Sequence, residues 1–245
     1  MFPKIETLKG KPYLSISIIE CGEKLVAIPT NFAFTTPHPY QSLGAQYGDR
    51  SPFSLREGVL HCLEASQKYL RSTKPNWCIK IFDAYRPLHI QKFMVEHTFL
   101  QLIESRGWER DNLTAAQREE IMDLTLQFWA MPSEDPKMPP PHSTGAAIDV
   151  TLQDERGQEV NMGSDIDEVS PRSFPDYFKS VDSPEAKQFH ANRELLYAVM
   201  SSSGFQRHPN EWWHFSLGDQ MWAWLVNQSC DSGDRNRVAR YGRVG

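Results

Sequence analysis

The sequence lacks the features that mark several large classes of protein. None of its four cysteines belongs to a Cys-x-x-Cys pair, so neither a thiolate metal site nor a dense disulfide framework is expected. No run of about eighteen apolar residues appears, which excludes an ordinary membrane-spanning helix. The first residues contain no basic start followed by an apolar segment. We therefore expect a cytoplasmic protein with no membrane partner.

Basic charge and several catalytic signatures are also missing. The formal net charge is -5, and the one short basic stretch, 235–240, is typical of a solvated terminus, so we expect no nucleic-acid partner. There is no His-Glu-x-x-His motif, no Gly-x-Ser-x-Gly motif and no glycine-rich phosphate loop. Their absence excludes a thermolysin-type protease, a serine hydrolase of the elbow type and a P-loop nucleotide site.

Length and composition indicate one globular domain. The chain has 245 residues, 40% of them hydrophobic, which is enough to bury a full-sized core. We expect a single domain over residues 1–245, with its core at about 12–228 and a flexible tail at 229–245.

Two segments carry the residue types of a catalytic metal site. The segment 142–149 reads HSTGAAID, and the segment 211–214 reads EWWH. A catalytic zinc ion takes three protein ligands from His, Asp or Glu and leaves one position for water, while a further carboxylate handles the proton. His142, Asp149 and His214 are candidates for the three ligands, and Glu211 for the fourth group.

Strand patterns place these residues. Ile148, Val150 and Leu152 alternate along one face of an expected strand over 146–152, and Asp149 lies on the other face. A buried carboxylate there needs a partner, and a metal ion is one such partner. In a regular strand Glu211 and His214, three residues apart, point to opposite faces. Glu211 must therefore precede the strand, or a bulge must redirect it.

The remaining segments alternate between strand and helix. We expect strands at 15–20 and 78–82, and no internal repeat. Helices are predicted from a capping box at Ser54 to about 71, from Pro87 to 107, after a second capping box at Thr114, and from Ser183 to just before Gly204.

Four motifs occur in the order found in one known family. They are DAYRP at 83–87, HSTGAAID followed by VTL at 142–152, MGS at 162–164 followed by Asp167, and EWWH at 211–214. With these motifs the chain resembles the D-alanyl-D-alanine dipeptidases, zinc peptidases used in vancomycin resistance and cell-wall dipeptide turnover. The resemblance runs from about residue 79 to 215. It implies an α+β fold with a small antiparallel sheet flanked by helices, and one Zn²⁺ per chain.

The resemblance also implies a role for each matching residue. The zinc ligands would be His142, Asp149 and His214, and the catalytic base would be Glu211. Arg86 would stabilise the transition state, and Asp167 would hold the free amino group of a dipeptide substrate. Two segments depart from the family. Proline occupies positions 140 and 141, where the resistance enzymes carry serines. The segment 37–44 differs from the family's usual tyrosine and asparagine signature, so Tyr40 or Tyr47 becomes a candidate substrate contact.

Each role has a structural alternative. Arg86 would otherwise form an ion pair with Asp83, Glu211 would orient a ligand, and Asp167 would cap the turn at 164–166.

Three functions follow: a D-Ala-D-Ala dipeptidase, a related carboxypeptidase or endopeptidase acting on longer peptidoglycan stem peptides, and a zinc-binding module without catalysis. A carboxylate that blocks the amine end of the cleft favours the dipeptidase. The oligomeric state stays open.

Overall fold

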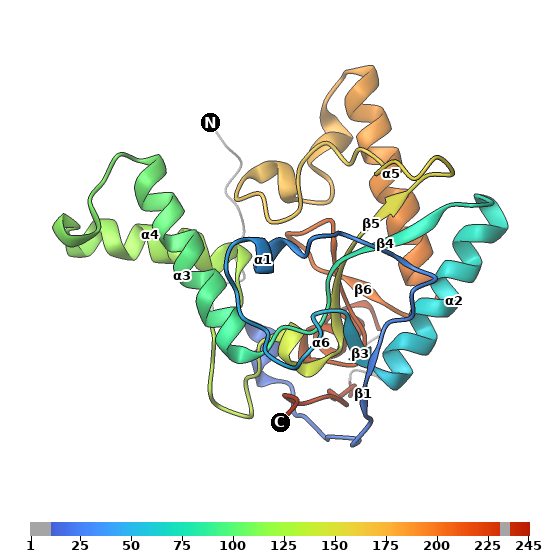
Figure 1. Ribbon diagram of the computed structural model, residues 1–245, viewed down its shortest axis with the longest axis horizontal. Coiled ribbons are helices and arrows are strands. Elements are labelled where there is room, and N and C mark those ends of the chain that lie inside the picture. The colour runs from blue at the N-terminus through green and yellow to red at the C-terminus, as the bar shows by residue number, and fades with distance from the viewer. Residues whose placement is uncertain (1–10, 231–235) are drawn as a thin grey trace.

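A five-stranded sheet forms the centre of the protein. The computed structural model describes residues 11–230 and 236–245 (Figure 1). The strand order is β2-β4-β5-β7-β6, and neighbours are antiparallel except β2, which runs parallel to β4 at one edge. The strands are β2 (Ala33–Phe34), β4 (Cys78–Asp83), β5 (Ala147–Gln153), β6 (Gln206–Arg207) and β7 (His214–Ser216); β1 (Leu25–Ala27) and β3 (Ser54–Arg56) form a separate antiparallel pair.

Helices surround this sheet. The α-helices are α1 (Pro39–Ser42), α2 (Glu57–Thr73), α3 (Leu88–Ser105), α4 (Ala115–Phe128), α5 (Pro184–Ser201) and α6 (Gln220–Ser229). Short 3₁₀ helices are η1 (Pro12–Ser15), η2 (Arg110–Asn112), η3 (Pro141–Thr144), η4 (Pro171–Ser173) and η5 (Tyr177–Ser180). A single compact domain with mixed helices and sheet confirms the predicted α+β class.

One face of the sheet is covered by α2 and α5, which pack side by side (Figure 1). Ile79 lies opposite Leu152 and Ile81 opposite Val150, and all four are fully buried in the main core with side chains of both helices. Because side chains alternate along a strand, Asp149 belongs to the other face. The apolar residues thus fix the sheet against the helices and leave the opposite face for the site.

A β-bulge near the end of β4 changes what faces Asp149. The register shifts between Ile81 and Asp83, so Asp83 lies opposite Asp149. A regular antiparallel ladder would have placed Phe82 there. The extra residue therefore brings two acidic side chains together beside the start of the Arg86 segment, and bulges are frequent next to active sites for this reason.

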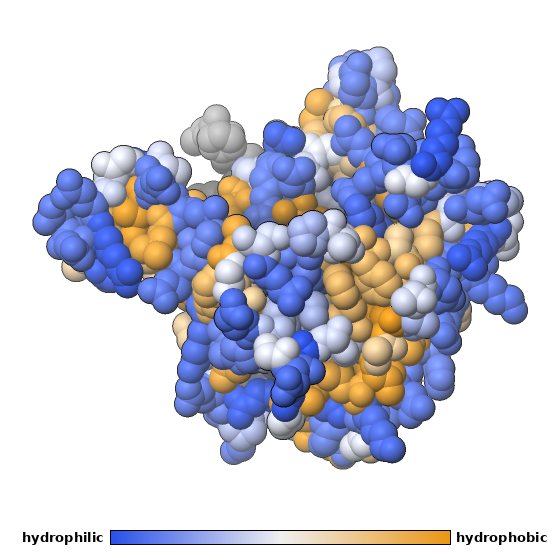
Figure 2. All heavy atoms as spheres, in the orientation of Figure 1, coloured by the Kyte–Doolittle hydropathy of each residue, from blue (hydrophilic) through white to orange (hydrophobic). Residues whose placement is uncertain are grey.

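The α3–α4 hairpin projects from the sheet (Figure 1). Its outer surface is hydrophilic and apolar atoms lie between the two helices (Figure 2). Phe99 and Ile103 of α3 and Ile121 of α4 form this small separate core. The C-terminal end of α4 reaches the candidate site described below.

Several expected elements are confirmed. Strands at 78–83 and 147–153 and the four longer helices occur close to their predicted bounds. Thr114 forms the predicted capping box with Gln117, and Ser183 caps α5 with Pro184 in its first turn. Gly204 follows that helix with a φ of 92°, a conformation that glycine adopts without steric cost.

Three expectations were wrong. Residues 15–20 form no strand: η1 ends at Ser15, and only Ile18 makes an isolated bridge, to Ala239. The capping box at Ser54 is absent because Ser54 pairs with Ala27 in β3, and α2 begins at Glu57 instead. The flexible tail is contradicted over 236–245, where Ala239 and Tyr241 are buried against the body; residues 231–235 lie outside the described part. Within the described residues, no helix combines the length and apolarity needed to cross a membrane.

Candidate metal centre

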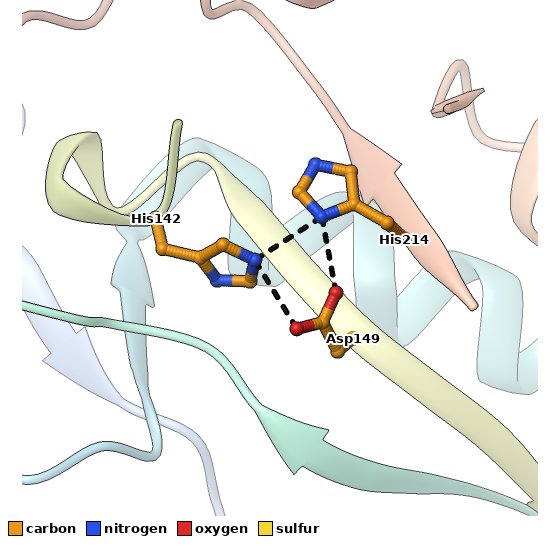
Figure 3. Close-up of side chains that lie close together, drawn as sticks. All are labelled: His142, Asp149 and His214. Atoms are coloured by element: carbon orange, nitrogen blue, oxygen red, sulfur yellow. Dashed lines mark hydrogen bonds and ion pairs between the residues drawn. The ribbon is translucent and has the colours of Figure 1, made fainter. Parts of the chain in front are cut away.

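Three buried side chains from two separate segments of the sequence converge on one point (Figure 3). His142 Nε2 lies 3.1 Å from His214 Nδ1 and 3.2 Å from Asp149 Oδ2, and His214 Nδ1 lies 3.0 Å from Asp149 Oδ1. At 1–5% exposure, these side chains are almost fully removed from solvent. The structure thus brings together the three residues predicted as ligands.

The backbone fixes each of the three positions. Asp149 of β5 pairs with His214 of β7 across the ladder. His142 lies in η3, directly after two prolines and before Gly145, whose φ of 71° closes the turn. A side chain on Gly145 would meet the Leu25 side chain at 2.6 Å. The turn is therefore held by conformation and by close packing.

Hydrogen bonds set the tautomers of both histidines. His142 Nδ1 lies 2.7 Å from the carbonyl oxygen of Ala84, which only accepts, so Nδ1 carries the proton. Ser216 donates to Asp219 and its oxygen lies 3.4 Å from His214 Nε2, so Nε2 is the protonated atom there. Each neutral imidazole then points an unprotonated nitrogen at the other and at Asp149.

This arrangement fits a metal ion. Two nitrogen lone pairs and a carboxylate face one another within hydrogen-bond distance, and they repel unless a cation lies between them. Burial lowers the pKa of His214, which favours the neutral form that a metal binds. Two histidines and one carboxylate form a typical catalytic zinc set.

Glu211 lies beside these ligands. It precedes β7, as its spacing from His214 required, and is buried. Its Oε2 is 3.8 Å from His214 Nδ1, and its Oε1 is 3.8 Å from His208 Nδ1. Burial raises the pKa of Glu211 well above the usual value, and the Asp149 and Asp167 carboxylates add to this shift. A raised pKa suits a general base, which must also release its proton.

Arg86 is held in place from several sides. Its Nε donates to Asp83 at 2.9 Å and its Nη1 to Gln91 at 3.0 Å. Its Nη2 lies 3.2 Å from Asp149 Oδ2 and donates to Tyr40 at 2.8 Å. The pairing with Asp83 considered above therefore exists, and the same guanidinium also contacts a candidate ligand.

Asp167 lies on a loop with a φ of 63° and is partly buried. It accepts a hydrogen bond of 2.8 Å from the Tyr40 hydroxyl, so Arg86, Tyr40 and Asp167 form a chain of contacts. Burial and the Asp149 carboxylate raise the pKa of Asp167 to about 7. Tyr47 donates to Asp83 at 3.2 Å instead. Of the two candidate tyrosines, Tyr40 is the one that contacts Asp167.

One cavity of about 350 Å³ unites the candidates. The candidate ligands, base, transition-state group and ammonium contact all line it: Arg86, His142, Asp149, Asp167, Glu211 and His214. The candidate tyrosines Tyr40 and Tyr47 are not among the lining residues. Sequence motifs did not point to further lining residues such as Lys11, Tyr13, Trp129 and His208. They lie outside the motifs, and only the fold brings them to the cavity. The volume suits a small ligand.

A second group of possible metal ligands occurs among the described residues. Asp176, His190 and Glu194 bring ligand atoms together on the surface, with Asp176 exposed and the other two partly buried. Glu194 already forms an ion pair with Arg207 at 3.2 Å. The enclosed group of His142, Asp149 and His214 is therefore the stronger candidate for a catalytic ion.

Comparisons with known proteins agree with the motifs. The profile of the D-Ala-D-Ala dipeptidase family matches residues 33–232. The chain is 48% identical over 241 residues to the D-alanyl-D-alanine dipeptidase of Synechocystis sp., covering 96% of this chain and 97% of the relative. It is 49% identical over 137 residues to the dipeptidase of the same name from Escherichia coli K12, covering 56% and 53% of the two chains. A solved LD-carboxypeptidase structure matches 91% of this chain and 81% of its own, with a TM-score of 0.45 at 13% identity. The chain belongs to the D-Ala-D-Ala dipeptidase family of peptidases.

Proposed function

We propose that this protein hydrolyses the peptide bond of D-alanyl-D-alanine with one zinc ion held by His142, Asp149 and His214. The convergence of two unprotonated imidazole nitrogens and a carboxylate in a buried cavity carries the metal assignment. The dipeptide assignment is supported by the relative from Synechocystis, which is named for this activity and is similar over nearly the whole chain.

A bound zinc ion would supply polarisation of the substrate carbonyl and would lower the pKa of a water from about 15.7 to about 7. Glu211 would take the proton of the attacking water as the water oxygen bonds to the carbonyl carbon. The C–N bond then breaks, and Glu211 returns the proton to the departing amine. The raised pKa of Glu211 favours the first half of this transfer, in which the carboxylate accepts the proton.

Arg86 is proposed to stabilise the transition state. Negative charge grows on the carbonyl oxygen during attack, and a fixed positive group lowers the energy of that charge in an enclosed site. Contacts with Asp83, Gln91 and Tyr40 hold the guanidinium before substrate arrives. Little reorganisation is then needed during the reaction.

Asp167 is proposed to bind the free ammonium of the dipeptide. It lines the same cavity as the ligands, and Tyr40 orients its carboxylate. A carboxylate that pairs with the free ammonium favours a substrate whose N-terminal residue lies at that end of the cavity. This observation supports a dipeptidase over a carboxypeptidase or endopeptidase that acts on longer stem peptides. Glu211 and Arg86 in the same cavity support catalysis over a zinc module without activity.

The experiment compares D-Ala-D-Ala with a pentapeptide that ends in D-Ala-D-Ala, using purified zinc-loaded protein and measuring released D-alanine. The proposal predicts release from the dipeptide and none above background from the pentapeptide. Equal or faster release from the pentapeptide would replace the dipeptidase with a carboxypeptidase. If neither substrate releases D-alanine, both the dipeptidase and the carboxypeptidase functions are excluded. Cytoplasmic location and the lack of a nucleic-acid partner stay predictions from sequence.

A further inference from the structure

A dipeptide carries two opposite charges, and the cavity must accept both. Asp167 offers a negative partner for the ammonium, so the substrate carboxylate needs a positive or hydrogen-bonding partner elsewhere. Among the lysine and arginine side chains of the described residues, only Lys11 and Arg86 line the cavity. Pro140 and Pro141, which precede His142, have no backbone N–H to offer a carboxylate.

The donors of Arg86 are largely committed. Nε donates to Asp83, Nη1 donates to Gln91, and Nη2 serves both Tyr40 and Asp149. The guanidinium also lies against the Tyr40 and Trp129 rings, with its central carbon 4.8 and 4.9 Å from their centroids. Only one of its five N–H donors, on Nη1, has no partner among these contacts, so Arg86 offers a second carboxylate at most one direct hydrogen bond unless it gives up a partner.

Lys11 has donors to spare. Its Nζ donates to the carbonyl oxygen of Trp129 at 3.1 Å, and an ammonium group has three donors. No carboxylate of the described residues lies within 4.0 Å of this Nζ. Burial lowers the pKa of Lys11 to about 8, and the charge of Glu211 opposes that shift. A partly desolvated ammonium without an ion-pair partner favours the arrival of an anion.

Lys11 and Asp167 share one electrostatic neighbour in the cavity, Glu211, and otherwise have different ones. The groups that act most strongly on Asp167 are Asp149, Arg86, Tyr40 and Asp83. Lys11 interacts with Glu211 and with His208. Its partner Trp129 follows α4, on the wall made by the end of that helix. A dipeptide spanning the two charges would place its peptide bond beside the ligands and Glu211.

We propose that Lys11 binds the C-terminal carboxylate of the substrate and so fixes the direction of the dipeptide in the cavity. This inference rests on the proposed function and adds to Asp167 a second charged residue that recognises the substrate. With Asp167 at the amine and Lys11 at the carboxylate, the cavity selects molecules that carry both charges. Lys11 is a residue that determines specificity, and Glu211 and the metal ligands perform the chemistry.

The test measures kcat/KM for D-Ala-D-Ala and for D-Ala-D-alaninamide, which lacks the carboxylate charge, together with zinc content. Lys11→Met removes the ammonium while keeping an unbranched side chain, and Lys11→Arg keeps the charge. Lys187→Met, an exposed lysine on α5 that pairs with Asp182, is the matched control. The same four proteins are compared on both substrates.

Lys11→Met is expected to lose at least about 30-fold in kcat/KM on D-Ala-D-Ala, mainly through KM, because a buried charge loses its partner. The loss on the amide should stay below about threefold, Lys11→Arg should recover part of the activity, and zinc content should not change. Equal losses on both substrates, or none on the acid, would overturn the role of Lys11. A wild-type protein that releases no D-alanine from D-Ala-D-Ala would instead overturn the proposed function, and the Lys11 assignment with it.

Discussion

Asp149 lies directly opposite His214 in the antiparallel ladder, with Oδ1 of the carboxylate 3.0 Å from Nδ1 of the imidazole. Opposite residues of an antiparallel pair project to the same face, so the backbone pairing itself aligns two proposed ligands. His142 comes from a turn, and the Arg86 N–H donates to its carbonyl at 3.2 Å. The site is therefore built on rigid elements.

Removing the carboxylate of this pair should weaken zinc binding. Asp149→Ala is expected to lower zinc affinity by at least about 100-fold, because even partners outside the ligand set contribute 10–100-fold. Competition with a chromophoric chelator measures the affinity. Asp165→Asn, which changes an exposed carboxylate, is the control and should bind zinc like the wild type. Unchanged affinity in Asp149→Ala would exclude Asp149 as a ligand.

Replacing Glu211 should abolish catalysis without affecting metal binding. Glu211→Gln keeps the shape of the side chain and removes the base, so kcat should fall by about 10²–10⁴ while zinc content stays at the wild-type level. Glu185→Gln, at the start of α5, serves as the control. A loss of zinc together with activity would assign Glu211 to ligand positioning instead.

Arg86 is predicted to act on the transition state as well as on the fold. Arg86→Lys keeps the positive charge but cannot maintain the four contacts of the guanidinium. We expect kcat to fall by about 10²–10³, with a smaller change in KM. Urea unfolding of the same variant gives the stability loss. If the variant is less stable but keeps the wild-type kcat, Arg86 has no catalytic role and acts only through its structural ion pair with Asp83.

The affinity for the dipeptide should depend on the ionisation of Asp167. Burial and the Asp149 carboxylate raise the pKa of this carboxyl group to about 7. The other charged or hydrogen-bonding groups that act on it are Arg86, Tyr40, Asp83 and Glu211. Below that pH the group is neutral and cannot pair with an ammonium.

KM for D-Ala-D-Ala should therefore rise as pH falls below about 7, as measured in a pH series of initial rates. Asp167→Asn should have a raised KM that no longer follows this transition. A wild-type transition that survives in Asp167→Asn would belong to another group. Unchanged kinetics in this variant would exclude the ammonium contact.

Arg193 supports the loop that carries Asp167. This buried arginine donates to the carbonyl oxygens of Met162, Arg172 and Phe174 at 2.7–2.9 Å and to Ser164 Oγ at 3.0 Å. Arg193→Met would leave these acceptors without their donors. We expect a loss of about 3 kcal/mol or more in the free energy of unfolding, measured in urea. Lys187→Met, elsewhere on α5, should stay near the wild type.

Local sequence signals predicted most elements and identified residues that the fold brings together. His142, Asp149, Glu211 and His214 occur in two short motifs, and the strand around Asp149 alternates clearly, so these motifs were enough to make them candidates for one site. Signals failed where distant contacts decide the structure. Residues 54–56 contain a capping box, but pairing with β1 makes them a strand.

The cavity walls could not be predicted in the same way. Lys11, Tyr13 and Trp129 join the motif residues around the cavity only after the chain has folded, and no spacing rule connects positions so far apart. The last ten residues resemble a solvated tail in composition. Burial of Tyr241, whose hydroxyl donates to Glu23 at 2.8 Å, holds them against the body.

The single zinc centre is tested by a zinc titration of chelator-stripped protein, with D-alanine release from D-Ala-D-Ala measured at each point. We predict negligible release from the stripped protein, and release that rises with added zinc and saturates at one zinc per chain. Hydrolysis that persists without metal, or that requires binding in excess of one ion per chain, would contradict a single zinc centre formed by His142, Asp149 and His214.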